Sequence, residues 1–114
     1  MDFDEYQMLS KETAEQWADP DASSEYDQKL TAMFLALATN GESGELAEKV
    51  KKYVREDDEQ YLEDAKYEIG DILWYLSQLA SLLDENFSDI AEDNIEKLFD
   101  RDERNQILGE GDYR

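Results

Sequence analysis

The stretch Glu68–Leu83, which reads EIGDILWYLSQLASLL, decides the fold class of this chain. Its apolar residues recur every three or four positions, which is the spacing of one face of an α-helix. The stripe consists of Ile69, Ile72, Leu73, Leu76, Leu79, Ala80 and Leu83. Trp74 and Leu82 extend the apolar surface beyond that stripe. A helix that is apolar on more than one side is usually buried from more than one side, so we predict a core helix that also reaches a subunit interface.

Helical patterns also cover the rest of the chain. One proline and five glycines interrupt it, and no run alternates in the manner of a β-strand. We therefore predict an all-α fold of four helices. The predicted helices span about Phe3 to Ala18, a stretch capped by Ser23 or Ser24 that runs to about Arg55, roughly Glu59 to Leu83, and a stretch capped by Ser88 or Asp89 that runs to about Arg101. The breaks are Asp19-Pro20-Asp21, Glu56-Asp57-Asp58 and Asp84-Glu85-Asn86, and residues 105–114 form an irregular tail.

The composition limits both the domain count and the chemistry. The chain has 114 residues, which suit a single domain spanning residues 1–114 with one core. It contains no Cys and no His, which excludes disulfide frameworks, zinc fingers, cysteine nucleophiles and Ser-His-Asp triads. The 31 acidic residues exceed the 11 basic ones and give a net charge of −20.

This charge also limits the partners. A surface so negative repels nucleic-acid backbones and anionic lipid, so we expect neither nucleic acid nor a membrane as a partner. No apolar stretch approaches the ~20 residues that cross a bilayer, and residues 1–5 lack the cationic start of a signal peptide, which predicts a cytoplasmic protein. The acidic excess is typical of a halophilic protein, because concentrated salt screens carboxylate repulsion. An ordinary acidic protein or a phage protein is the alternative.

The second predicted helix has an irregular pattern. Its first half carries an apolar stripe of Leu30, Met33, Phe34 and Leu37. At about 100° per residue, the same stripe continues past Gly41 with Glu45 and Glu48, and Glu42 lies at its edge. One interpretation is a kink at Asn40-Gly41 that turns this face to water. The other is that the carboxylates face inward because a cation lies there.

Four carboxylates form two matching pairs, Glu42-x-x-Glu45 and Glu68-x-x-Asp71. Residues three apart share one helix face, so two facing pairs could supply an all-oxygen site without histidine. Such a site suits Mg²⁺ or Mn²⁺. In each pair a glycine, Gly44 or Gly70, precedes the second acid, which would allow a ligand or another helix to approach closely.

The segments around these pairs resemble a known family. The stretch 37–52, which is Ala-rich before GESGELAEKVKK, resembles the first half of the MazG-like all-α nucleotide pyrophosphohydrolases, and the stretch 68–76, EIGDILWYL, resembles the second half. The motif Asn94-Ile-Glu-Lys97-Leu-x-x-Arg101 and the ending GEGDYR at 109–114 resemble the closing segment, although residues 101–107 are more acidic than usual. The resemblance implies a four-helix bundle of this family. The helices carry excess apolar surface for so small a monomer, so we expect oligomerisation, as a homodimer or homotetramer, to complete the bundle. The resemblance also implies Mg²⁺-dependent hydrolysis of a nucleoside triphosphate to its monophosphate and pyrophosphate, with house-cleaning of non-canonical nucleotides as one such role. The implied metal ligands and catalytic acids are Glu42, Glu45, Glu68 and Asp71.

Few cations and aromatic residues are available for the nucleotide. By resemblance the candidate substrate-binding residues are Asn94 and Lys97, followed by Lys52, Arg101 and Arg114. Cations near helix C-termini are also favoured by the helix dipole alone. Trp74, Trp17 and Tyr75 are candidates for base stacking, with core packing as the alternative for each.

Two other functions fit the same sequence. An acidic helical interaction protein, or a nucleic-acid mimic, would explain the charge without catalysis and would need no metal. A regulatory relative would bind the nucleotide with Mg²⁺ and release no pyrophosphate.

Overall fold

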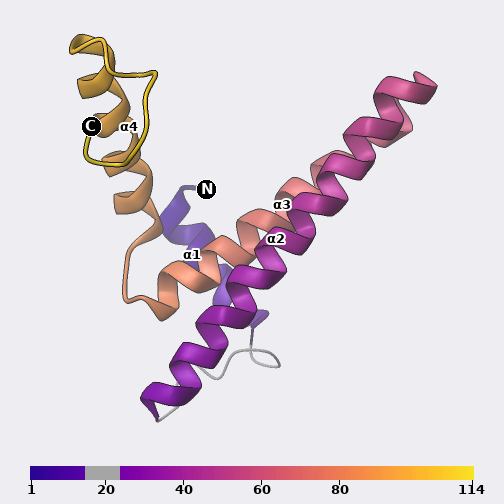
Figure 1. The fold of residues 1–114 in the computed structure, drawn as a ribbon. Helices are drawn as coiled ribbons and strands as arrows, with labels where there is room; N and C mark the ends of the chain where they lie inside the picture. The colour runs from indigo at the N-terminus through magenta and orange to yellow at the C-terminus, as the bar shows by residue number, and fades with distance from the viewer. Residues whose placement is uncertain (15–23) are drawn as a thin grey trace.

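A computed structural model of the chain describes residues 1–14 and 24–114 (Figure 1). The helices in these ranges are α1 (Phe3–Glu12), α2 (Glu25–Glu56), α3 (Gln60–Leu82) and α4 (Phe87–Glu103). No strand occurs among the described residues, so the all-α prediction is confirmed. The predictions that concern Trp17, Asp19-Pro20-Asp21 and Ser23 lie outside the described residues.

The first helix is shorter than predicted. A capping box of Asp2 and Glu5 begins it, and the helix ends at Glu12 instead of extending through residues 13 and 14 toward Ala18. Its last turn is closed by bonds three residues apart, from the Thr13 N–H to the Ser10 carbonyl at 3.2 Å and from the Ala14 N–H to the Lys11 carbonyl at 3.1 Å. Bonds of this kind tighten a helix end and stop its propagation.

The second and third helices begin and end close to the predicted positions. The Ser24 hydroxyl caps α2 by accepting a hydrogen bond from the Asp27 N–H at 3.1 Å, as predicted. The helix then runs without interruption through Asn40-Gly41 and ends before Asp57, which has a left-handed φ of 51°. Figure 1 shows α2 and α3 side by side and antiparallel along most of their length.

The fourth helix is capped from outside its own sequence. Asn86 occupies the N-cap, so the predicted caps Ser88 and Asp89 are wrong. The N–H of Phe87 donates instead to Oε1 of Gln7, on α1, at 2.8 Å. This bond satisfies one of the unpaired N–H groups that every helix start exposes, so a local side-chain cap is not needed.

Polar side chains join α1 to α3. The Ser10 and Ser77 hydroxyls lie 2.9 Å apart, and Nε2 of Gln78 donates to the Ser10 hydroxyl at 2.9 Å. All three residues are buried. Gln7 also donates to the Ser81 hydroxyl and to the Glu85 carbonyl, at 3.0 and 2.9 Å. These hydrogen bonds therefore help to position α1 against α3.

The predicted core stripes are only partly buried within one chain. On α2, Met33 is 55% exposed and Leu37 is 64% exposed, and the buried residue of this segment is Leu35. On α3, Ala80 is buried, whereas Ile69 is 55% exposed. These stripes remain uncovered because α4 packs on α1 and on α3 and makes no contact with α2. The radius of gyration is 16.8 Å, compared with about 13 Å for a compact domain of this length.

None of the described helices has the length and apolar character required to cross a membrane.

Candidate metal centre

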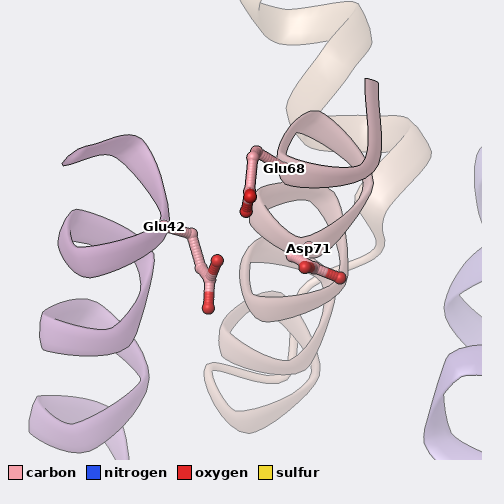
Figure 2. Close-up of side chains that lie close together, drawn as sticks. All are labelled: Glu42, Glu68 and Asp71. Atoms are coloured by element: carbon pink, nitrogen blue, oxygen red, sulfur yellow. The ribbon is translucent and has the colours of Figure 1, made fainter. Parts of the chain in front are cut away.

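Three carboxylates from α2 and α3 converge in the middle of the helix pair. Glu42, Glu68 and Asp71 each offer an oxygen, and these oxygens all lie within 4.8 Å of one another. Figure 2 shows Glu42 extending from α2 toward α3, where Glu68 and Asp71 lie one turn apart. Glu42 and Glu68 are half-buried and Asp71 is exposed. We call these three residues the acid cluster.

The helical hairpin explains this convergence. The turn at residues 57–59 returns α3 antiparallel to α2, which brings the middle of α2 opposite the first half of α3. Glu68 and Asp71 then share a face of α3 because they are three residues apart. The neighbouring glycines are not required for close packing within the chain, since a Cβ at Gly44 or Gly70 would meet nothing within 4 Å.

The electrostatics of the acid cluster centre on Glu42. Burial raises the pKa of Glu42, and the negative charges of Glu45, Asp71 and Glu68, together with a side-chain hydrogen bond to Glu68, raise it further. Its Oε2 atom is buried and has no hydrogen-bond partner among the described residues. A buried, unpaired carboxylate oxygen costs free energy unless a cation or a proton compensates it. Converging hard oxygen donors with an orphaned member fit a divalent cation such as Mg²⁺ or Mn²⁺.

Glu45 does not belong to the acid cluster. It is exposed on α2, although it lies close enough for its charge to raise the pKa of Glu42. The structure therefore brings together three of the four predicted ligands and leaves Glu45 beside them. On α2, Glu48 is half-buried and forms ion pairs with Lys51 at 2.7 Å and Lys52 at 3.7 Å, so its charge is already compensated.

The predicted phosphate-binding cations have other partners within the chain. Arg101 is 4% exposed and donates from Nη2 to the carbonyls of Asp112 and Gly111, at 2.6 and 3.4 Å. Lys97 forms an ion pair with Asp112 at 3.5 Å. Arg114 donates to the carbonyls of Gln106, Ile107 and Gly111. These contacts fold the tail, residues 105–114, back onto α4.

The remaining predicted substrate residues lie on three helices. Asn94 is exposed on α4, and Lys52 lies near the end of α2 with its ammonium 5.9 Å from the ring centre of Tyr61. Trp74 is half-buried on α3, and its ring meets that of Tyr75 edge-on with the centres 5.1 Å apart. No basic side chain is among the charges that shift the pKa of Glu42.

Two contacts near the site were not predicted from the pattern. The Trp74 indole N–H donates to the Thr13 hydroxyl at 2.7 Å, which fixes the indole against the end of α1. Burial raises the pKa of Tyr6, and the charge of Asp71 raises it further. Tyr6 on α1 and Thr13 just past its end fall outside the acid pairs, and no local spacing links them to α3.

Comparisons with known proteins identify the type of domain in which the acid cluster lies. The family described as the MazG nucleotide pyrophosphohydrolase domain matches residues 30–105, which include all four predicted acids. The chain is 36% identical over 118 residues to the Gene 37 protein of Mycobacterium phage L5, and the match covers 100% of both proteins. No solved structure matches the chain. The family match spans more than half of the chain, and the chain therefore belongs to the MazG nucleotide pyrophosphohydrolase domain family.

Proposed function

We propose that the chain hydrolyses a nucleoside or deoxynucleoside triphosphate to the monophosphate and pyrophosphate, with Mg²⁺ as the cofactor and Mn²⁺ as a substitute. The acid cluster carries this proposal, because it combines the ligand type, the geometry and an uncompensated buried oxygen within the matched family domain. A cytoplasmic location and the house-cleaning of non-canonical nucleotides are parts of the same proposal, supported by the nucleotide chemistry of the family.

Glu42, Glu68 and Asp71 would hold the divalent ion. When bound, such an ion neutralises phosphate oxygens and lowers the pKa of water. In the proposed reaction a water oxygen bonds to the α-phosphorus, and the bond from that phosphorus to the bridging oxygen of the β-phosphate breaks. The bridging oxygen keeps the electron pair and leaves with pyrophosphate. Glu45 lies beside the cluster and is exposed, so its carboxylate is free to accept the proton that the water loses.

A metal titration combined with a nucleotide panel tests these roles. The wild-type chain is incubated with each NTP and dNTP plus Mg²⁺, at low and molar salt, and pyrophosphate is measured. Asp71→Asn should lose both turnover and Mn²⁺ binding, because a ligand is removed. Glu45→Gln should lose turnover by about 100-fold or more while Mn²⁺ binding stays. Full turnover in both variants would show that neither Asp71 nor Glu45 is needed for the reaction.

The same assay separates the alternative functions. An acidic interaction protein would show no Mn²⁺ binding at the acid cluster, and a regulatory relative would bind the nucleotide and metal but release no pyrophosphate. A gain of activity in molar salt would support the halophilic assignment, since screening is strongest there.

We also propose that the functional form is a homodimer or a homotetramer. Met33 and Leu37 present an apolar face on α2 that no other helix of the described chain covers. Exposed apolar patches of this kind mark association sites in proteins. Leu37→Glu should lower the mass measured by light scattering to that of one chain or one dimer. Lys29→Glu, an exposed change on the same helix, should leave the mass unchanged, and equal masses for all three proteins would contradict the proposal.

A further inference from the structure

One side of α4 is apolar and lies open in the part of the chain that the structure describes. Ile95, Leu98 and Phe99 on this side are 52%, 40% and 67% exposed. Three hollows of about 460, 360 and 270 Å³ follow this side of the helix. They are continuous, because the first two share Ala91 and the last two share Ile95. We call the surface of Ala91, Ile95, Leu98 and Phe99 the α4 groove. A continuous exposed apolar surface of this kind marks an association site.

A row of carboxylates borders the α4 groove. Glu92, Glu96 and Glu103 are exposed, and at 100° per residue they lie within about 40° of one another around the helix. We call them the glutamate row. None of the three has an ion-pair partner among residues 1–14 and 24–114. The row follows the apolar residues by about a quarter of a turn around α4. A partner that fits the groove therefore has to bring cations beside an apolar strip.

The last turns of α2 carry a surface of this kind. Residues 49–55 contain four basic residues and no acidic one, in a chain with 11 basic residues. Val50 and Val54 are 42% and 74% exposed. Lys51 and Arg55, which we call the basic row, are also exposed. The basic row follows the two valines by about a quarter of a turn around α2, which is the offset found on α4.

The basic row is available for another partner. Lys51 pairs with Glu48 at 2.7 Å and Arg55 pairs with Glu56 at 2.8 Å. All four side chains are well exposed to solvent. Exposed ion pairs of this kind contribute little to stability, so they can be exchanged for pairs with a second molecule.

The two surfaces also match in spacing and direction. Glu92 and Glu96 are four residues apart, as are Lys51 and Arg55. Each charged row lies on the same rotational side of its apolar strip, so the rows meet when the two helices pack antiparallel. In that arrangement Glu92 lies opposite Arg55 and Glu96 lies opposite Lys51. Charge pairs beside an apolar strip determine partner and orientation when helices associate.

The two surfaces do not meet within one chain. In the described residues α4 makes no contact with α2. Figure 1 shows α4 following the end of α3 that is farther from the α2–α3 turn. The matching surface therefore has to come from a second copy. Two α4 grooves that packed antiparallel would place two glutamate rows side by side, and like charges in an interface are unfavourable.

We propose that the α4 groove of one copy binds residues 47–55 of a second copy, and that the same contact forms in return around a twofold axis. The inference does not depend on hydrolysis. It concerns a surface other than the α2 face of Met33 and Leu37, so the two contacts together would join dimers into a tetramer.

Charge reversal tests the contact. One variant combines Glu92→Lys with Glu96→Lys, and a second combines Lys51→Glu with Arg55→Glu. The control combines Asp89→Lys with Asp93→Lys, which are exposed, have the same spacing and lie on another side of α4. Association constants are measured by sedimentation equilibrium at about 0.15 M NaCl, in the wild-type chain and in Leu37→Glu. The Leu37→Glu chain keeps both surfaces of the proposed contact.

Each reversal should weaken association by at least about tenfold, because like charges then face each other. The control should stay within about twofold of its parent chain, since it makes the same change in net charge outside the groove. An equimolar mixture of the two reversal variants should associate again, because every groove then faces a row of opposite charge. Recovery in the mixture is the result that a general effect of net charge would not produce.

Three results would overturn the proposal. The first is the same association constant for both reversals, the control and the parent chain. The second is stronger association when Glu92→Gln is combined with Glu96→Gln, which would mean that one groove binds another groove. The third is a wild-type chain that stays monomeric. Pyrophosphate release is measured separately, so the failure of one proposal does not decide the other.

A cross-link provides an independent measurement, because the chain contains no Cys. Ile95→Cys mixed with Val50→Cys should form a disulfide between two copies. The control is Ile95→Cys mixed with Tyr67→Cys, at a residue of α3 that is 74% exposed. The first mixture should cross-link at least about tenfold faster, because only its two thiols are held together by the contact. Equal rates would contradict the proposal, even if circular dichroism showed that the reversal variants were unfolded.

Discussion

Removing one carboxylate from the acid cluster should raise stability without metal and reduce the stabilisation by metal. Without an ion, the oxygens of Glu42, Glu68 and Asp71 lie within 4.8 Å of one another. Two unit charges at that separation repel by about 0.9 kcal/mol in a water-like dielectric and by about 3.5 kcal/mol at an effective value of 20. Glu42→Gln removes two of the three repulsive pairs. Because Asp71 is exposed, the lower figure is the appropriate one, and the expected gain is about 1–2 kcal/mol at pH 8.

Thermal unfolding measured by circular dichroism provides the assay. In EDTA, the Tm of Glu42→Gln should exceed that of the wild type by about 4–8 °C. At a Mn²⁺ concentration 100 times the Kd, the wild type should gain about 2.7 kcal/mol, because only the folded state presents the site. Glu42→Gln should gain much less, since it has lost a ligand.

The control separates local repulsion from the general effect of a net charge of −20. Glu96→Gln removes the same charge from an exposed position on α4, away from the acid cluster. Equal shifts in Tm for Glu96→Gln and Glu42→Gln in EDTA would refute the local repulsion. Equal stabilisation of the wild type and Glu42→Gln by Mn²⁺ would refute the cluster as the binding site.

Three further predictions concern pH, the helix junction and the tail. Because the pKa of Glu42 is raised, the metal-free native state binds more protons than the unfolded state. The free energy of unfolding should therefore fall as pH rises from about 4.5 through the raised pKa. In urea titrations at different pH values, Glu42→Gln should lack this fall. Gln7→Ala leaves the Phe87 N–H without its partner and should cost about 2–4 kcal/mol in urea unfolding, whereas a loss near zero would mean that water replaces the side chain. Arg101→Gln should release the tail, because it removes the bonds to the Gly111 and Asp112 carbonyls. Limited proteolysis should then cut residues 105–114 faster than in the wild type, while the helix content stays unchanged. Equal cleavage rates in the variant and the wild type would contradict this prediction.

The helices themselves were predictable because their signals are local. The apolar periodicity of α3 and the serine cap of α2 each act within a few residues, and both gave positions close to those observed. The start of α4 was missed because its first N–H is satisfied by Gln7, 80 positions earlier in the chain. The end of α1 was missed because its apolar pattern continues beyond the turn at Thr13, where the hydroxyl accepts the Trp74 indole N–H. Long-range hydrogen bonds of this kind produce no periodic pattern in the sequence, so they cannot be predicted from it.

The packing of the stripes was harder to predict than their existence. A pattern shows which face of a helix is apolar, but it does not show whether the same chain covers that face. Leu35 is buried whereas Leu37, two positions later and within the predicted stripe, is 64% exposed. Leu35 lies beside Gln78 and Leu82 of α3, whereas Leu37 is about 200° further around α2, on a side that no helix of the described chain covers.

The candidate site shows the same division between residue type and placement. Spacing placed Glu68 and Asp71 on one face of α3, and the α2–α3 hairpin brought Glu42 opposite them, whereas Glu45 at the same spacing stays outside the cluster. Spacing could not place the cations. Arg101 uses its guanidinium to hold the tail, and no basic group of the described chain is among the charges that act on Glu42. A triphosphate would add several negative charges to this acidic centre. The compensating charge must therefore come from bound divalent ions, from a second copy of the chain, or from cations released when the tail moves, and the first of these is what the Mn²⁺ titration measures.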